Sequence, residues 1–144
     1  MTQLQAEQVA QLLNERNELI CTYTAEKVLQ YADNYLLEVL NETIVACVEI
    51  KKVQWYQWEI SHLSVRKEHE RKGLGKQLIH RAEEKAKNGD ALIVQCTIRV
   101  GNKASEQTFR RNGYQKACRF FFPRSDRNVA VWQKVLSTTQ KRTV

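Results

Sequence analysis

The alternation of apolar and polar side chains is clearest in the middle of the chain. From Trp58 to Val65 the two kinds alternate, which is the period of a half-buried strand. Seven charged or imidazole residues follow, from Arg66 to Lys72. Beyond them the apolar positions share one helical face, at Leu74, Leu78, Ile79, Ala82 and Ala86. Asn88-Gly89 ends this run, because Gly takes the left-handed conformation that ends helices. The pattern predicts a strand, a charged turn and a helix.

The rest of the chain carries patterns of the same two kinds. Amphipathic spacing predicts helices over 4–16, from an N-cap at Thr24 through Tyr31, and over 102–111. Stretches rich in β-branched and aromatic residues predict strands over 35–40, 43–53, 91–100, 114–122 and 128–136. The first two strands would form a hairpin, and the apolar run at 91–100 indicates a strand covered on both faces. This order predicts an α/β (α+β) fold, a mixed sheet with helices on its faces.

Length and composition favour one globular domain over 1–144, with 42% hydrophobic and 27% charged residues. No apolar run reaches the ~20 residues of a membrane-spanning helix and nothing resembles a signal peptide, so we expect a soluble, cytoplasmic protein. The tail, 138–144, is expected to fray. The four cysteines contain no CxxC pair, which favours reduced core thiols over zinc or disulfides, and no metal is predicted.

Charge is divided unequally along the chain. Residues 1–50 contain two Lys/Arg and eight Asp/Glu, a balance of −6, whereas residues 51–144 contain 21 and eight, a balance of +13. The second segment therefore favours an anionic partner. A phosphorylated cofactor would use it, and nucleic acid is the rival interpretation.

The glycine turn before the central helix suits a phosphate. A helix N-terminus presents N–H groups without backbone partners, and its dipole is positive there. Gly73 and Gly75 would let a pyrophosphate approach the backbone, while Arg71, Lys72 and Lys76 supply countercharge. An ordinary solvated turn is the alternative interpretation of an isolated GxG.

Two motifs resemble those of one family. Glu70-Arg71-Lys72-Gly73-Leu74-Gly75 resembles the acetyl-CoA-binding motif R/Q-x-x-G-x-G/A of the GNAT superfamily of N-acetyltransferases, with Glu70 at its first position. Asn102-Lys103-Ala104-Ser105, Phe109 and Gly113-Tyr114 is similar to the N-x-x-(A/S)…Y-x-x-x-G-F/Y segment, and the matches cover 58–136. The resemblance implies the GNAT fold, a mixed, mostly antiparallel sheet flanked by about four helices. Its short first strand would come from residues 1–4 or be absent.

The resemblance also implies a reaction, the transfer of an acetyl group from acetyl-CoA to a primary amine of a small molecule, amino acid or peptide. Glu59 occupies the position of the family's catalytic glutamate, on a strand face shared with Ser61, Leu63 and Val65. His62 is the alternative base, on the opposite face unless a bulge intervenes. Leu74 lies inside the cofactor motif, the backbone N–H groups of Leu63, Ser64 and Val65 would polarise the thioester carbonyl, and Asn102 would bind the pantetheine arm.

Two residues besides Glu70 depart from the family's pattern. Phe109 stands where many members have a tyrosine that protonates the leaving sulfur, and Thr97 stands where the ribosomal-protein subfamily has a glutamate. Thr97 argues against membership of that subfamily. Phe109 and Glu70 make a catalytically silent acyl-CoA-binding or regulatory domain one alternative, and the balance of +13 makes a basic nucleic-acid-binding domain a less favoured one. Glu38, Glu42 and Glu49 could attract a cationic acceptor. The sequence leaves the acceptor and a possible homodimer open.

Overall fold

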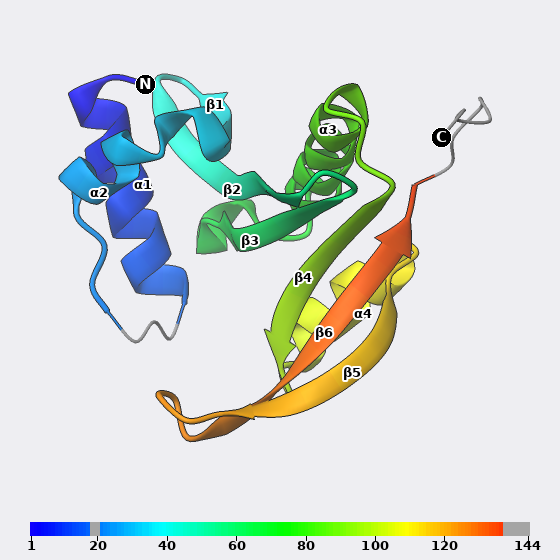
Figure 1. Cartoon of the computed structure of the whole chain (residues 1–144). Helices are drawn as coiled ribbons and strands as arrows, with labels where there is room; N and C mark the ends of the chain where they lie inside the picture. The colour runs from blue at the N-terminus through cyan, green and yellow to red at the C-terminus, as the bar shows by residue number, and fades with distance from the viewer. Residues whose placement is uncertain (18–20, 137–144) are drawn as a thin grey trace.

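The computed structural model describes residues 1–17 and 21–136, so the predicted frayed tail, 138–144, lies outside the described residues. Figure 1 shows helices on both sides of one sheet. The elements are α1 (Gln3–Arg16), α2 (Ala25–Gln30), the 3₁₀ turn η1 (Ala32–Asn34), β1 (Tyr35–Leu40), β2 (Thr43–Gln54), β3 (Gln57–Val65), the 3₁₀ turn η2 (Lys67–His69), α3 (Leu74–Asn88), β4 (Ile93–Arg99), α4 (Lys103–Arg111), β5 (Gln115–Phe122) and β6 (Arg127–Val135). This order confirms the mixed α+β prediction.

Polar caps begin the N-terminal helices. The Thr2 hydroxyl accepts from the Gln5 N–H at 3.1 Å and the Gln5 side chain accepts from the Thr2 N–H at 2.9 Å, a complete capping box. Thr24 caps α2 by accepting from the Lys27 N–H, as the sequence predicts. Because α1 begins at Gln3, the optional strand over residues 1–4 is absent from the described chain.

The six strands form one sheet in the order β1-β2-β3-β4-β6-β5. Every neighbouring pair is antiparallel except β3 and β4, which are parallel. Their pairing covers only three positions, from Gln57 opposite Ile93 to Glu59 opposite Gln95. β3 continues to Val65 and β4 to Arg99 without pairing again, and Figure 1 shows the two strands diverging. The sheet is therefore split into two halves by a V-shaped gap.

Helices cover the two halves differently. One core lies between the sheet and the layer of α3 and α4, where Leu78, Ala82 and Phe109 pack against β2, β4 and β6. A second core lies on the opposite face, where α1 and α2 pack Val9, Leu13 and Val28 against β1 and β2. The N-terminal half of the sheet is thus covered on both faces. The open face of the other half has no helix among the described residues.

This arrangement corrects the prediction that residues 91–100 form a strand covered on both faces. Val94, Cys96 and Ile98 of β4 are buried, but the alternating residues are half-buried and Thr97 is exposed. The prediction of core thiols is also only half right. Cys47 and Cys96 are buried, whereas Cys21 and Cys118 are exposed, and all four are free.

The central helix ends as predicted, but for a different physical reason. Gly89 has an ordinary φ of −92°, and the left-handed residue is Asp90, with a φ of 68°. A Cβ on Gly89 would lie 2.3 Å from a ring carbon of Trp58. Gly89 is therefore required by the close approach of the indole and not by its own backbone conformation.

None of the helices among the described residues is long and apolar enough to cross a membrane.

Candidate active site

The point where β3 and β4 separate carries polar side chains on the open face. Glu59 forms the last paired position with Gln95, and on its other side it lies opposite Lys51 of β2. Gln95 accepts a hydrogen bond from the Gln133 amide at 3.3 Å, which ties β4 to β6 beside this point. Beyond Glu59, backbone groups on the β4 side of β3 lose their strand partner. The fork therefore combines a half-buried carboxylate with exposed backbone donors.

Register determines which of these donors face the gap. The Arg66 N–H donates to the Val45 carbonyl at 2.8 Å, so Arg66 points to β2. Antiparallel strands alternate, which directs the N–H of Ser64 to β2 as well and those of Leu63 and Val65 into the gap. The Ser64 hydroxyl is buried, where it accepts from the Asn17 amide at 2.7 Å and donates to the His62 carbonyl at 3.1 Å.

The glycine loop leaves the N-terminus of α3 open. Gly73, at the N-cap position, has a left-handed φ of 79° and provides no side-chain cap. A Cβ on Gly73 would meet nothing within 4 Å, so its conformation and not local space requires glycine. A Cβ on Gly75 would touch Leu63 at an ordinary 3.9 Å. The first N–H groups of this 15-residue helix and its dipole are therefore directed at an uncapped end that fits a phosphate.

Charged side chains around this loop favour an anion. Arg71, Lys72 and Lys76 are all exposed beside the open helix end, and Leu74, the first residue of the helix, packs against the core. Glu70, the acidic departure in the motif, forms an ion pair with Arg16 at the end of α1. Its charge is therefore engaged by α1, and its side chain also joins the N-terminal helix to the loop.

Asn102 and Phe109 lie on α4. The Asn102 side chain accepts from the Ser105 N–H at 3.4 Å and so caps this helix. Phe109 is 5% exposed and packs edge to face on Tyr114, with ring centroids 5.1 Å apart. The Tyr114 hydroxyl donates to Glu83 at 2.8 Å inside the core. Both rings therefore serve packing, and neither supplies a proton donor to the open face.

Strand β3 contains a bulge that the sequence did not reveal. Its register with β2 shifts between the pairs Ser61–Glu49 and Ser64–Cys47, so one extra residue stands in β3. His62 adopts a left-handed φ of 54° there. The expectation that Leu63 and Val65 share the face of Glu59 is wrong as a result, whereas for His62 the alternative with a bulge applies. Leu63 and Val65 pack toward the α3 core and do not share the face of Glu59, while His62 lies on the α1 side beside Glu49.

A cluster of side chains forms around this bulge. The Tyr23 hydroxyl lies 2.7 Å from His62 Nε2, and the Glu49 carboxylate lies 3.7 Å from the same nitrogen. Burial is the main cause that lowers the pKa of His62 below 6.5, and Lys51 and Lys27 add to it. Burial likewise raises the pKa of Glu49 above 4.5, partly offset by Lys51 and by hydrogen bonds from Tyr35, Asn34 and Ser61. Tyr23 gave no sequence signal, because only folding brings its loop to β3.

The three glutamates proposed to attract a cationic acceptor do not form one surface. Glu38 pairs with Arg81 of α3 at 2.8 Å, on the face opposite His62, and Glu42 lies in the turn between β1 and β2. Glu49 is only 8% exposed. The three carboxylates therefore do not act as one acidic patch, and Glu49 acts on its buried neighbours.

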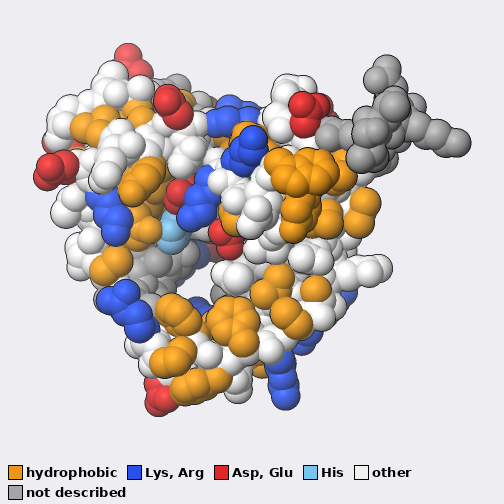
Figure 2. Space-filling model, in the orientation of Figure 1, with side chains coloured by type: hydrophobic (Ala, Val, Ile, Leu, Met, Phe, Trp, Pro, Cys, Tyr) orange, Lys and Arg blue, Asp and Glu red, His pale blue; other side chains and the backbone are white. Residues whose placement is uncertain are grey.

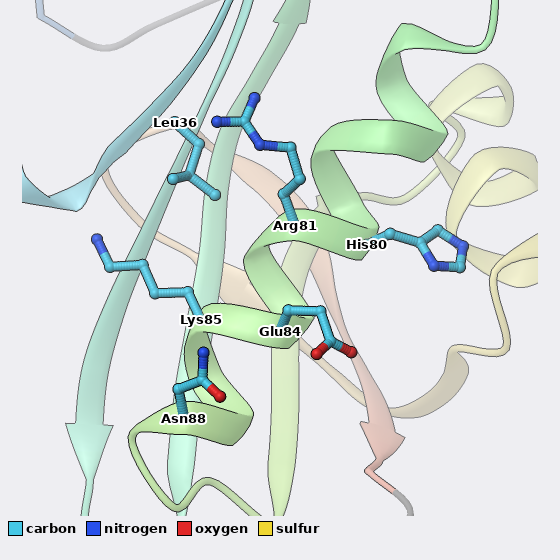
Figure 3. A pocket seen from close by; sticks show the side chains of 6 residues that line it. All are labelled: Leu36, His80, Arg81, Glu84, Lys85 and Asn88. Carbon is cyan, nitrogen blue, oxygen red and sulfur yellow. The ribbon is translucent and has the colours of Figure 1, made fainter.

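The surface has one hollow beside the fork and another on the other face of the sheet. Figure 2 shows a hollow on the open face between the N-terminal helices and the β5–β6 hairpin, with His, basic and acidic side chains at its rim. Another hollow of about 420 Å³ lies between α3 and β1, on the other face. Figure 3 shows its lining residues, Leu36, His80, Arg81, Glu84, Lys85 and Asn88. Arg81 and Lys85 both donate to carbonyls near β1, so their charges hold the helix to the sheet.

Within residues 1–17 and 21–136, no three potential ligands are grouped for a metal ion.

Comparisons with solved structures find the same fold. Ard1 from Thermoplasma volcanium aligns with a TM-score of 0.82 at 14% identity, over 96% of this chain and 95% of that one. The ribosomal-protein-S18-alanine N-acetyltransferase from Escherichia coli aligns with a TM-score of 0.78 at 11% identity, over 100% and 96%. A GNAT family acetyltransferase from Elizabethkingia anophelis, solved with acetyl-CoA bound, gives 0.73 at 17% identity, over 88% and 89%.

Sequence comparison defines the family. No curated protein matches the chain. The profile described as the acetyltransferase (GNAT) family matches residues 3–114, which include the fork, the glycine loop and all of α4. The split sheet, the open helix end and this match lead to one conclusion: the chain belongs to the GNAT family of acetyltransferases.

Proposed function

We propose that the protein transfers the acetyl group of acetyl-CoA to a primary amine by direct attack of the amine on the thioester. The observation that carries this proposal is the fork between β3 and β4, which brings together Glu59, the unpaired backbone donors of β3 and the uncapped N-terminus of α3. The arrangement offers a carboxylate, hydrogen-bond donors and a phosphate site along one continuous path.

Binding of acetyl-CoA would use groups on both sides of the fork. The N-terminal N–H groups of α3 at Gly73, Leu74 and Gly75 would hold the pyrophosphate, with countercharge from Arg71, Lys72 and Lys76. The N–H groups of Leu63 and Val65 face the gap, where they could hydrogen-bond the pantetheine arm or the thioester carbonyl. Ser64 would support that strand from behind, and Asn102 would contact the arm from α4.

Chemistry in this site needs a free amine and a leaving thiolate. An alkylammonium has a pKa of ~10.4, so a positioned base is worth ~10²- to 10⁴-fold in rate. Glu59 is that base in our proposal. Phe109 cannot replace the family's tyrosine on α4 as a proton donor, because its ring carries no hydroxyl. A thiol with a pKa near ~8.5 leaves as the thiolate without one, so acid assistance is dispensable at neutral pH.

Calorimetric titration with acetyl-CoA and with CoA tests the proposal. Gly75→Glu should abolish binding, because it places a carboxylate at the phosphate site, whereas Gly75→Ala should bind normally, since its Cβ has an ordinary 3.9 Å contact. Thiol release would then be followed with small amines, amino acids and peptides beginning with alanine. The last group is chosen because two aligned structures are named ribosomal-protein-alanine N-acetyltransferases.

The outcomes separate the alternatives. Turnover that falls at least ~10²-fold in Glu59→Gln, with unchanged acetyl-CoA affinity, would support the base assignment. Binding without turnover on any acceptor would favour a silent acyl-CoA-binding domain, the alternative that Phe109 favours. A wild type that binds no acetyl-CoA but binds DNA with a steep salt dependence would overturn the proposal in favour of nucleic-acid binding.

A further inference from the structure

The bulge in β3 brings together three proton-carrying side chains from separate parts of the chain. Tyr23 comes from the loop before α2, His62 from the bulge and Glu49 from β2. The Tyr23 oxygen and His62 Nε2 are 2.7 Å apart, and Glu49 Oε2 is 3.7 Å from that nitrogen. The rings of Tyr23 and His62 also meet edge to face, with centroids 5.0 Å apart. Geometry therefore provides a short path for a proton from Tyr23 to His62, with a carboxylate behind it.

The backbone supports a functional interpretation of this cluster. A left-handed conformation costs a residue with a Cβ about 1 kcal/mol or more, and such strain concentrates at functional sites. Without the extra residue, the alternation of β3 would turn His62 toward the α3 core, away from Tyr23 and Glu49. The bulge therefore costs stability, and it places the imidazole on the α1 side of the sheet, beside Tyr23 and Glu49.

The cluster lies close to the fork. His62 follows Glu59 by three residues, a separation of about 10 Å along a strand. The bulge occurs where β3 has left β4, and the His62 side chain is 21% exposed whereas that of Glu49 is 10% exposed. Exposure thus decreases from the imidazole toward the carboxylate. A group that enters the open face meets Tyr23 and His62 before it meets Glu49.

Amine acetylation releases two protons, and Glu59 can hold only one of them. An arriving ammonium must lose a proton before its lone pair can attack, and the nitrogen loses a second as the amide forms. If both losses passed through a single carboxylate, it would have to release the first proton before attack. A second acceptor near the fork removes that requirement.

We propose that Tyr23 and His62 remove the first proton, from the arriving ammonium, and that Glu59 removes the second; this inference rests on the proposed function. The ammonium gives its proton to the Tyr23 oxygen while the Tyr23 proton passes to His62 Nε2. The imidazolium that forms is stabilised by Glu49. The free amine then attacks, the C–N bond forms, and the C–S bond breaks with its electron pair on sulfur. Solvent takes the protons from His62 and Glu59 after release of the amide.

The charges around His62 suit this role. Lys51 of β2 and Lys27 of α2 raise the cost of protonating it, and burial acts in the same direction, so the pKa of His62 lies below 6.5. Glu49 opposes them, and Tyr35 is the other titratable group that contacts Glu49. Burial and Glu49 together raise the pKa of Tyr23, which keeps its proton available for transfer to His62. At neutral pH the pair is therefore a neutral imidazole beside a protonated phenol.

The test uses the fact that a high pH removes the first proton without help. The variants are Tyr23→Phe and His62→Asn, since Asn tolerates a left-handed φ well. Each should lower kcat/KM for an alkylamine about 10²-fold at pH 7, and the loss should shrink to a few-fold as the pH approaches ~10, the pKa of the acceptor. Glu59→Gln should stay impaired at every pH. Tyr31→Phe, at an exposed tyrosine of the neighbouring turn, should match the wild type throughout.

Two readouts protect the conclusion. Binding of acetyl-CoA should be unchanged in all of these variants, and a wild type that fails to bind it would refute the proposed function itself. Nitrogen NMR of the apo protein should show a shift of the His62 resonance in Tyr23→Phe, with the exposed His80 unmoved, whether or not turnover occurs. The relay is wrong if the losses in Tyr23→Phe and His62→Asn stay constant with pH, if activity stays within about twofold of wild type, or if the His62 resonance does not move.

Discussion

Two buried glutamates, each close to a tyrosine, make a useful comparison. Glu83 of α3 accepts from the Tyr114 hydroxyl at 2.8 Å inside the core and from the half-buried Lys134 Nζ at 3.0 and 3.2 Å. Glu49 of β2 has its nearest basic group, the His62 imidazole, at 3.7 Å, beyond hydrogen-bonding distance. We call Glu83, Tyr114 and Lys134 the core cluster, and Glu49, His62 and Tyr23 the bulge cluster. The first has regular backbone throughout, and the second contains a left-handed His62.

The difference shows how similar residues come to serve stability or chemistry. In the core cluster every partner is within bonding distance, so a proton has no reason to move and the charges are mutually satisfied. In the bulge cluster the imidazole is neutral, partly exposed and held by a strained backbone. Similar residue types can therefore hold a helix to a sheet or, in our proposal, carry protons. Which of the two they do depends on whether all partners are within bonding distance and whether solvent reaches them.

The largest expected effect is the difference in thiol reactivity between the buried cysteines beside the two clusters and the exposed cysteines. Cys47 lies beside the bulge cluster and Cys96 beside the core cluster, and burial raises the pKa of each thiol from 9.0 to about 12. Such a shift lowers the thiolate fraction about 10³-fold at pH 8. A disulfide reagent should therefore label only the exposed Cys21 and Cys118 in the native protein and all four in urea. Rapid native labelling of Cys47 would mean that the bulge side opens locally, which would sharpen the comparison.

Glu83→Ala should break the core cluster. It leaves the buried Tyr114 hydroxyl and the half-buried Lys134 ammonium without their acceptor, which should cost about 1–3 kcal/mol in the free energy of unfolding. The neighbouring Glu84 is 68% exposed and pairs with Lys87 at the surface, so Glu84→Ala should cost under about 0.5 kcal/mol. Urea unfolding of both variants measures the difference. Equal losses would mean that the core cluster contributes nothing beyond a surface pair.

Removal of one hydroxyl from each cluster should separate their roles. Tyr114→Phe should lower the free energy of unfolding by about 1–2 kcal/mol, because a buried hydrogen bond to Glu83 is lost, and leave kcat unchanged. Tyr23→Phe should do the reverse, with a small effect on stability and a large one on turnover at pH 7. Thermal unfolding and thiol-release kinetics on the same preparations test this, and a loss of turnover in Tyr114→Phe would break the comparison.

The smallest expected effect is on the pH dependence of stability. The pKa of His62 is lowered in the folded protein, so its contribution to stability decreases as the pH falls below 6.5. The pKa of Glu49 is raised, so its contribution is present at low pH and decreases as the pH rises above 4.5. His62→Asn should therefore gain stability relative to wild type on acidification from pH 7.5 to 5, and Glu49→Gln should lose it. Urea titrations at both pH values give the signs, and shifts of equal sign would contradict the assignment.

Sequence alone was sufficient for the order of helices and strands and for the position of the glycine loop. Both follow from local signals, namely amphipathic periods, the caps at Thr24 and Asn102, and glycines at turns. The family was likewise identified from two motifs, and the match over residues 3–114 confirms it. These features depend on residues that are near one another in the chain, so a pattern can carry them.

Tertiary structure alone decided which side chains surround the fork. The direction of His62 depends on a register shift between β2 and β3, and the separation of β3 from β4 depends on how two half-sheets twist apart. Strict alternation placed Leu63 with Glu59 and His62 opposite, because a pattern of period two contains no sign of an extra residue. Tyr23, Glu49 and His62 are brought together by pairing between distant segments. Their proximity, and with it the proposed route for the proton, is a property of the fold and not of any stretch of sequence.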